Sequence, residues 1–164
     1  MRRINCYKVE GKNSLRYLYK HVNFFKVVYN FTFIYLAKYT PWFELKNFLY
    51  KMVGIKIGAD VSVGLAVVMD IMYPQHITIG KNCVIGYNST ILCHEYLIDQ
   101  YRIGNVEIGK NVLIGANCTI LPGVKIGDNS TVSACSLVNS DIPANSFYGG
   151  VPAKLIRKET KNEK

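Results

Sequence analysis

The chain has 164 residues, enough for one hydrophobic core and one appended segment, and it carries 20 basic against 11 acidic side chains. The excess of positive charge is confined to one end, because residues 1–54 hold ten basic and two acidic side chains whereas residues 55–164 hold ten and nine. Five cysteines without a C-x-x-C pair argue against a disulfide framework and against a zinc site, so we expect reduced thiols in the cytosol.

Residues 1–54 are predicted to form a basic, aromatic-rich helical arm. Two helices are expected, at about 14–39 and 42–53, because Pro41 cannot continue the first helix and suits the start of the second. Ser14 is the expected N-cap of the first helix. Fourteen of the 20 aromatic residues lie in the first 52 positions, many of them close to lysines. This mixture favours contact with a membrane interface, and a helical cap over the end of the next domain is the alternative.

The arm is not expected to cross a membrane. Its longest uncharged stretch, residues 27–37, is eleven residues long, far short of the roughly 20 that a spanning helix needs. No signal peptide is evident, so we expect a cytoplasmic protein, and the arm adds the option of a peripheral position at the inner face of the membrane. The basic charge alone would also suit nucleic acid, but the interleaved aromatic residues favour the membrane.

From residue 55 onward the sequence repeats every six positions. In each unit an aliphatic residue, usually followed by glycine, precedes a small or β-branched residue by four positions. The aliphatic positions are Ile57, Val63, Ile79, Ile85, Ile91, Ile108, Ile114, Ile120, Ile126, Val132 and Val138. This pattern predicts a three-sided prism of parallel strands with about five coils, in which both residues point inward and the glycine relieves a tight turn. Residues 55–157 are assigned to this domain and residues 158–164 to a charged tail.

Two insertions interrupt the repeat. Four extra residues lie between Met69 and Ile79, and five lie between Ile91 and Ile108. Because an insertion in a solenoid must project as a loop, and such loops often carry function, these segments are the first places to look for a site.

The segment VEIGKNVLIGANCTILPGVKIGDNSTVSACSLVNSDIPANSFYGGVPAKLIR resembles the hexapeptide-repeat acyltransferases, close to the galactoside, maltose and xenobiotic O-acetyltransferases. The resemblance covers roughly residues 55–157 and leaves out the arm. It implies a left-handed parallel β-helix with an N-terminal α-helical arm, assembled as a homotrimer with active sites between subunits. It also implies direct acetyl transfer from acetyl-CoA, without a metal, to a hydroxyl of a sugar or glycan.

In that resemblance His94, within TILCHEYLIDQYRIG, matches the family's general base. An imidazole titrates near neutral pH and can therefore take a proton from an alcohol, which is a poor nucleophile by itself. Asp70 approximately matches a carboxylate that binds acceptor hydroxyls, and it could instead orient the base. Glu95, Tyr101 and Arg102 are further acceptor-binding candidates beside the base. The alternatives are a surface-loop histidine that makes an ordinary hydrogen bond for His94, a solvated aspartate in a turn for Asp70, and side chains that hold the loop in place for the other three.

The resemblance also supplies candidates for binding the acetyl donor. Ala116, Ala134 and Asn139 match positions that contact coenzyme A through the backbone. Lys154 and Arg157 match a basic pair that holds the nucleotide phosphates, and their charge suits that role. The competing interpretation of the pair is two solvated surface bases.

The sequence has three alternatives to direct acetyl transfer by His94. A thiol nucleophile at Cys93 is disfavoured because neighbouring side chains on an extended backbone point to opposite faces. A γ-carbonic anhydrase shares the prism but needs three metal-binding histidines. This chain has only three histidines, of which His21 lies in the arm and His76 in the first insertion, so we do not expect that activity. We interpret both as structural or incidental. A non-catalytic trimeric scaffold with a membrane- or partner-binding arm remains the alternative to an enzyme.

Overall fold

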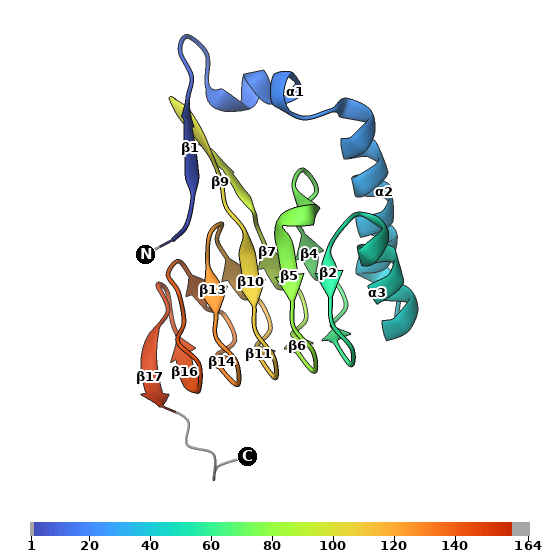
Figure 1. The fold of residues 1–164 in the computed structure, drawn as a ribbon, viewed down its shortest axis with the longest axis vertical. Helices are drawn as coiled ribbons and strands as arrows, with labels where there is room; N and C mark the ends of the chain where they lie inside the picture. The colour runs from blue at the N-terminus through green and yellow to red at the C-terminus, as the bar shows by residue number, and fades with distance from the viewer. Residues whose placement is uncertain (1, 159–164) are drawn as a thin grey trace.

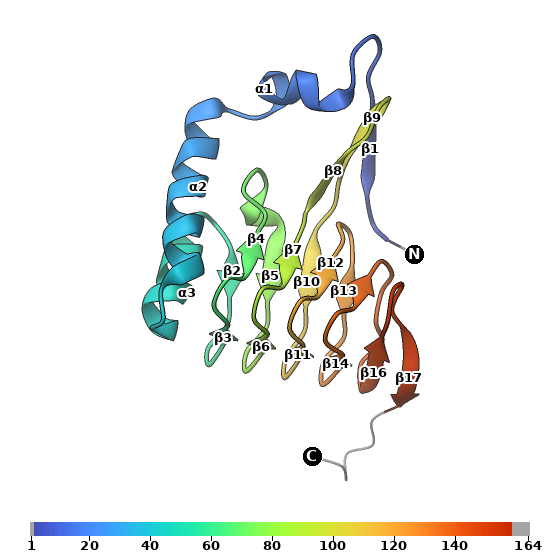
Figure 2. The ribbon, with the colours of Figure 1, turned by 180° about the vertical axis from the view of Figure 1, so that it is seen from behind.

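The structure, a computed structural model, describes residues 2–158 (Figure 1). Of the predicted tail, residues 158–164, only Lys158 lies within the described part, as the last residue of β17 (Lys154–Lys158). An N-terminal arm and a three-sided parallel β-helix make up this part of the chain, and the arm runs along one end and one edge of the helix (Figures 1 and 2).

Each hexapeptide forms one short strand, and three successive strands make one coil. The coils comprise β2 (Lys56–Ile57), β3 (Ser62–Val63) and β4 (Val68–Met69); β5 (Ile77–Ile79), β6 (Val84–Ile85) and β7 (Thr90–Ile91); β10 (Val106–Ile108), β11 (Leu113–Ile114) and β12 (Thr119–Ile120); and β13 (Lys125–Ile126), β14 (Thr131–Val132) and β15 (Leu137–Val138). We call the sheet β2-β5-β10-β13 the first face, the sheet β3-β6-β11-β14-β16 the second face and the sheet β4-β7-β12-β15 the third face. At the end of the second face, β16 (Ser146–Gly149) pairs antiparallel with β17.

The interior contains the residues that the repeat predicted. Equivalent positions of parallel strands stack at about 4.8 Å, so the aliphatic residues form columns inside the prism. Ile85, Ile91, Ile114 and Ile120 are fully buried in these columns. The small inward residues are also buried: Val61, Val67, Cys83, Ser89, Val112, Cys118, Val124, Ser130 and Ser136.

The repeat glycines have a different role from the predicted one. None of those that follow the aliphatic residue has a positive φ, so they do not form the tight turn. A Cβ on Gly115 would lie 2.4 Å from the backbone nitrogen of Ala134, and one on Gly80 would lie 2.4 Å from the oxygen of Gly109. The glycines are therefore needed because the next coil passes too close for a side chain.

Asparagine instead supplies the left-handed turn residue in most coils. Asn82, Asn111 and Asn129 have φ between 54° and 57°, a conformation that asparagine tolerates better than most residues. Their side-chain amides also bond from coil to coil, since Asn82 donates to Asn111 at 2.9 Å and Asn111 donates to Asn129 at 3.0 Å.

The two insertions project at the same corner of the prism. The first follows β4 and contains η2 (Pro74–His76). The second is an antiparallel hairpin of β8 (His94–Tyr96) and β9 (Gln100–Ile103). Strands β7 and β10 are consecutive in the coil, so Ile91 and Ile108 are seventeen positions apart where six suffice. The insertion therefore has eleven extra residues, not the predicted five. The prediction assumed that one more hexapeptide repeat lies between Ile91 and Ile108, but those six residues are part of the hairpin.

The arm differs from the prediction at its start. It consists of β1 (Asn5–Lys8), η1 (Ser14–Tyr17), α1 (Leu18–His21), α2 (Phe24–Tyr39) and α3 (Phe43–Met52). Strand β1 was not predicted, because its four residues are all exposed and show no alternation of polar and apolar side chains. The first predicted helix is interrupted before Asn23, whose side chain caps α2 by accepting from the Lys26 amide at 3.2 Å. Ser14 is not a helix cap, because its buried hydroxyl donates to the Leu97 carbonyl at 2.6 Å.

Helix α3 closes the open end of the prism. Amides of the first coil, such as those of Ser62 and Gly64, donate to carbonyls of the second coil, and several carbonyls of the first coil face the arm instead. Side chains of α3 donate to them: Asn47 to Val61 at 2.7 Å, Lys46 to Val63 at 3.1 Å and to Gly64 at 2.9 Å, and Tyr50 to Val67 at 3.3 Å. Burial lowers the pKa of Lys46, whose ammonium is held by these carbonyls alone among the described residues. The cap that was the alternative role for the arm is confirmed by these contacts.

Candidate active site

The corner between the third face and the first face gathers the polar residues of both insertions. Asp70 comes directly after β4, and His94 comes three positions after the end of β7. Strands β4 and β7 are neighbours in the third face, with Met69 opposite Ile91. Residues 24 positions apart in the sequence are therefore brought to the same corner in adjacent coils.

Asp70 and His94 form a hydrogen-bonded pair. Oδ2 of Asp70 lies 2.6 Å from Nδ1 of His94, and the carboxylate is fully buried while the imidazole is 18% exposed. The carboxylate also accepts the Met72 amide at 2.9 Å and the Tyr73 amide at 2.8 Å on Oδ1, and the Cys93 amide at 2.6 Å on Oδ2.

The environment of Asp70 decides which nitrogen of His94 carries the proton. Burial by itself raises the pKa of this carboxyl, but the hydrogen bond and charge attraction from His94, with the amides of Tyr73 and Cys93, outweigh it and lower the pKa. An ionised carboxylate can only accept hydrogen bonds, so Nδ1 of His94 is the donor. Nε2 of the neutral ring then keeps its lone pair and can accept a proton.

Tyrosine side chains enclose the pair. The rings of Tyr73 and Tyr96 lie 5.9 and 5.4 Å from the His94 ring, and their hydroxyls are 3.4 Å apart. Tyr101 stacks on Tyr96 at 5.6 Å, and Tyr7 of the arm stacks on Tyr101 at 4.8 Å. Burial raises the pKa of both Tyr73 and Tyr96, so their phenols stay neutral at physiological pH.

The arm also supports the carboxylate from its other side. Asn30, buried on the inner side of α2, donates from Nδ2 to the carbonyl of Ile71 at 2.8 Å. Ile71 follows Asp70 directly, so α2 holds the backbone turn that presents the carboxylate to His94.

The hairpin divides the predicted acceptor-binding residues between its two sides. Residues directly opposite in an antiparallel pair share a side, and successive residues alternate. Tyr101 is opposite Tyr96 and therefore on the side of His94, whereas Glu95 and Arg102 are opposite each other on the other side. Glu95 forms ion pairs with Arg2 of the arm at 2.8 Å and with Arg102 at 3.7 Å. Acceptor binding by these two residues stays a prediction, and the contacts present tie the arm to the hairpin.

The predicted donor-binding residues lie in three places on the chain. Ala116 and Ala134 meet in adjacent coils at the corner between the second and third faces, where the Cys135 amide donates to the Ala116 carbonyl at 2.8 Å. Asn139 follows β15 and so lies at the same corner of the prism as the Asp70–His94 pair, but further along it. Lys154 and Arg157 are exposed on β17, with the Arg157 guanidinium 5.1 Å from the Phe147 ring centre.

Tyr7, Tyr73 and Tyr96 are site residues that sequence reasoning missed. Tyr96 lies two positions after His94, so alternation along an extended chain would have placed both side chains on the same side. No comparable signal marks Tyr7, which reaches the site only through the pairing of β1 with β9.

Cys93 does not have the properties of a nucleophile. Its side chain is completely buried, and burial raises the pKa of its thiol. Its contribution to the site is the backbone amide that donates to Asp70.

Two further observations concern residues 2–158. In this part of the chain no three His, Cys, Asp or Glu side chains converge closely enough to hold a metal ion. The helices described there are all too short or too polar to cross a membrane.

Comparison with known proteins agrees with the repeat. Residues 105–140 match the family described as bacterial transferase hexapeptide (six repeats), and residues 76–92 match the hexapeptide repeat of succinyl-transferase. "Putative acetyltransferase YvoF" of Bacillus subtilis (strain 168) is 51% identical over 157 residues, which are 95% of this chain and 91% of the relative. "Putative acetyltransferase SAR0816" of Staphylococcus aureus (strain MRSA252) is 47% identical over 161 residues, 96% of this chain and 100% of the relative.

The solved structures extend the comparison to the fold. A galactoside acetyltransferase in complex with coenzyme A superposes with a TM-score of 0.68 at 26% identity, covering 84% of this chain and 82% of that one. The two bacterial relatives match almost the whole chain, so their similarity includes most of the arm. The predicted fold class, a left-handed parallel β-helix with an N-terminal helical arm, is confirmed. With half of its residues identical to those of full-length relatives, this chain belongs to the hexapeptide-repeat acetyltransferases.

Proposed function

We propose that the protein transfers the acetyl group of acetyl-CoA to a hydroxyl of a sugar or glycan, with His94 as the general base. The observation that carries this proposal is the Asp70–His94 pair, in which a buried carboxylate holds Nδ1 at 2.6 Å and leaves Nε2 of a partly exposed ring free. This arrangement of carboxylate and imidazole is suited to taking a proton from an alcohol.

The proposed reaction is a direct transfer. Nε2 of His94 takes the hydroxyl proton while the acceptor oxygen attacks the thioester carbonyl carbon. As the new carbon–oxygen bond forms, the carbon–sulfur bond breaks, and the departing thiolate takes the proton back from Nε2. Asp70 remains ionised throughout and stabilises the imidazolium that forms between the two proton transfers. Its complete burial and four donors favour this orienting role over direct contact with the acceptor.

For the acetyl donor, we propose the groups that the family resemblance indicates. The backbone at Ala116, Ala134 and Asn139 would contact the pantetheine arm, and Lys154 and Arg157 would hold the phosphates. Support comes from the galactoside acetyltransferase that was solved with coenzyme A and from the exposure of both basic side chains on β17. A sugar acceptor is supported by the same relative, whose name specifies a galactoside.

We also propose a homotrimer with sites between subunits. The second face carries outward Val84 and Leu113, which are both about half exposed in the single chain. On one chain the alanines at one corner and the basic pair on β17 lie apart from the Asp70–His94 pair, so a neighbouring subunit would complete the site. Light scattering of the purified protein tests this, and a monomeric mass would contradict it.

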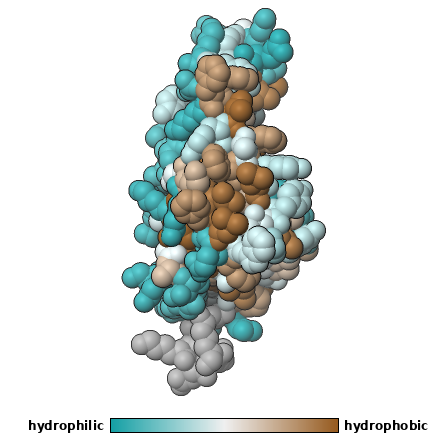
Figure 3. All heavy atoms as spheres, turned by 90° about the vertical axis from the view of Figure 1, so that its right-hand side faces the viewer, coloured by the Kyte–Doolittle hydropathy of each residue, from teal (hydrophilic) through white to brown (hydrophobic). Residues whose placement is uncertain are grey.

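The arm supports a further proposal, peripheral contact with an anionic bilayer. Figure 3 shows an apolar area over the helical side of the molecule. Aromatic side chains are exposed on α2 and at the start of α3: Phe25 is 79% exposed, and Trp42, which directly precedes α3, is 70% exposed. Lysines such as Lys26 and Lys51 lie on the same two helices. Aromatic rings with flanking bases suit the interface of a negatively charged membrane.

Sedimentation with vesicles tests the membrane contact. Wild type should sediment with vesicles that contain phosphatidylglycerol, and the double variant Phe25→Ser/Trp42→Ser should remain largely in solution. Val151→Ser, which changes an apolar residue that is 72% exposed between β16 and β17, is the matched control. Equal sedimentation of the double variant and the control would contradict the proposal. Removing residues 1–52 is a poor test, because it would also remove the cap that α3 provides.

The alternative is a trimeric scaffold without activity. Release of free coenzyme A from acetyl-CoA in the presence of sugar acceptors decides between the two. We expect His94→Ala to abolish release and Cys93→Ala to retain it. Absence of acetyl-CoA binding by the folded wild-type protein would favour the scaffold.

A further inference from the structure

A hollow of about 350 Å³ lies next to the hairpin that carries His94. We call it the arm-side hollow, and its polar walls are Arg3 and Asn5 of the arm, His76 of the first insertion, and Asn105 and Glu107 at the start of β10. Each wall therefore comes from a different part of the chain, and two of them lie outside the repeats.

The pairing of strands β1, β9 and β8 places the arm-side hollow near His94. Asn5 pairs with Ile103, and Ile103 pairs with His94, so the three residues form one row on the same side of the three-stranded sheet β1-β9-β8. Asn5 and Ile103 line the hollow. Two strand spacings separate Asn5 from His94, which is about 10 Å. A ligand that reaches both is longer than one sugar ring.

The arm is held closely where it forms this wall. The Arg3 amide donates to the Gly123 carbonyl at 3.0 Å, and a Cβ on Gly123 or Gly104 would lie 2.6 or 2.8 Å from the Arg3 carbonyl oxygen. The Arg3 guanidinium is 3.9 Å from Glu107 and 3.6 Å from Asp141. The first residues of the arm are thus seated on the prism and form a fixed wall.

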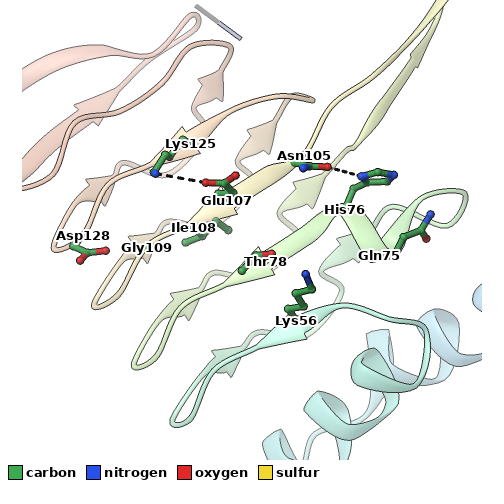
Figure 4. Close-up of a pocket in the computed structure, with 10 residues that line it drawn as sticks. All are labelled: Lys56, Gln75, His76, Thr78, Asn105, Glu107, Ile108, Gly109, Lys125 and Asp128. Atoms are coloured by element: carbon green, nitrogen blue, oxygen red, sulfur yellow. Dashed lines mark hydrogen bonds and ion pairs between the residues drawn. The ribbon is translucent and has the colours of Figure 1, made fainter. Parts of the chain in front are cut away.

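The hollow continues over the first face. A second hollow of about 590 Å³ shares His76, Asn105 and Glu107 with it (Figure 4). Here Lys56, Thr78, Glu107 and Lys125 stand in register on adjacent strands, at a spacing of about 4.8 Å. Figure 4 shows His76 bonded to Asn105 at one end and Lys125 paired with Glu107 further along, at 3.6 Å.

The side chains in the two hollows indicate the chemistry of the ligand. Amide, hydroxyl and imidazole groups offer both donors and acceptors, and within residues 2–158 no Phe, Tyr or Trp side chain lines either hollow. The larger hollow is lined by two lysines, Lys56 and Lys125, and by two carboxylates, Glu107 and Asp128. The Arg3 guanidinium is also close to Glu107, so the two hollows offer little net attraction to a phosphate-rich ligand. A neutral polyhydroxylated chain fits such a surface better than a nucleotide or a lipid tail.

We propose that the two hollows form an extended acceptor subsite for an oligosaccharide. The sugar that is acetylated would sit at His94, the next units would occupy the arm-side hollow, and the following ones would lie along the first face. This inference rests on the proposed acetyl transfer to a sugar. It gives a binding role to His76, which the sequence analysis interprets as structural or incidental.

The test is acetyl transfer to glucose, maltose, maltotriose and maltotetraose, measured as kcat/KM with labelled acetyl-CoA. We expect kcat/KM to rise at least tenfold from glucose to maltotriose. Thr78→Ala and Asn105→Ala should reduce this ratio to less than threefold. Thr119→Ala, which removes an outward threonine from the third face, is the matched control and should keep the ratio.

Three outcomes would overturn the inference. One is equal kcat/KM for all four sugars, and another is an unchanged ratio in both variants. The third is dissociation of the oligomer in the Thr78 or Asn105 variant, seen by light scattering, which would make the first face a subunit interface. Transfer to none of the four sugars, while acetyl-CoA is still cleaved, would instead count against the sugar acceptor of the proposed function, and the inference would fall with it.

Discussion

Replacing Asp70 with asparagine tests the proposed site most directly, because the side chain keeps its volume and loses only charge and two lone-pair positions. The carboxylate accepts four hydrogen bonds, two on each oxygen. If the new amide nitrogen replaces Oδ1, two buried backbone amides lose their acceptor. If it replaces Oδ2, only the Cys93 amide loses its acceptor. The second orientation is therefore favoured, because it leaves fewer buried amides without a hydrogen bond.

With the amide nitrogen at Oδ2, His94 can no longer donate from Nδ1. The ring must accept at Nδ1 and carry its hydrogen on Nε2, which blocks the nitrogen that would take the acceptor proton. General base catalysis contributes about 10²–10⁴-fold, and we expect kcat of Asp70→Asn to fall by that factor. The KM for acetyl-CoA should change little, since the proposed donor contacts lie elsewhere.

The same variant should also be less stable at neutral pH. One buried amide without an acceptor costs about 1–3 kcal/mol, which urea unfolding at pH 7 would detect. The folded-state pKa of Asp70 is lowered below its ordinary value of 3.8, so its stabilisation is present above that value and is lost as the pH falls through the folded pKa. The stability difference between wild type and Asp70→Asn should therefore narrow below about pH 4.

Steady-state kinetics with purified variants, together with circular dichroism as a check on folding, measures both effects. A folded Asp70→Asn protein with kcat within tenfold of wild type would refute the role assigned to the pair. A loss of stability that stays constant from pH 7 to pH 3 would refute the argument from the charge of Asp70.

Three further changes test other parts of the structure. Cys93→Ala should keep kcat within about threefold, since a buried thiol with a raised pKa is not the nucleophile, and a loss comparable to that of His94→Ala would restore the acyl-enzyme alternative. Gly115→Ala should destabilise the fold by about 3 kcal/mol or more in urea unfolding, because its Cβ would lie 2.4 Å from the next coil, and a variant as stable as wild type would disprove the close-approach argument. Asn47→Ala should lower stability by about 1–3 kcal/mol by leaving the Val61 carbonyl without its donor, whereas Lys51→Ala, an exposed change on the same helix, should stay within about 0.5 kcal/mol, so equal effects would contradict the capping role of α3.

The six-residue period placed the repeat glycines correctly, but the role predicted for them, relief of a tight turn, was wrong. The six-residue period identified the positions but could not distinguish a turn from a close approach, because glycine satisfies both. Distances between coils exist only in the folded prism, and they show that asparagine makes the turn while glycine admits the neighbouring strand.

The sequence by itself determined the prism, since every coil repeats the same local contacts and the inward residues can be read from their spacing. It also indicated His94 and Asp70 separately, through the insertions and the family resemblance. Only the tertiary structure decided that these two side chains meet, that Glu95 and Arg102 lie on the opposite side of the hairpin from His94, and that the arm begins with a strand beside the site. The physical reason is that these features depend on contacts between distant segments. The pairing of Tyr7 with Tyr101, or of Asn30 with Ile71, leaves no periodic signal in either partner.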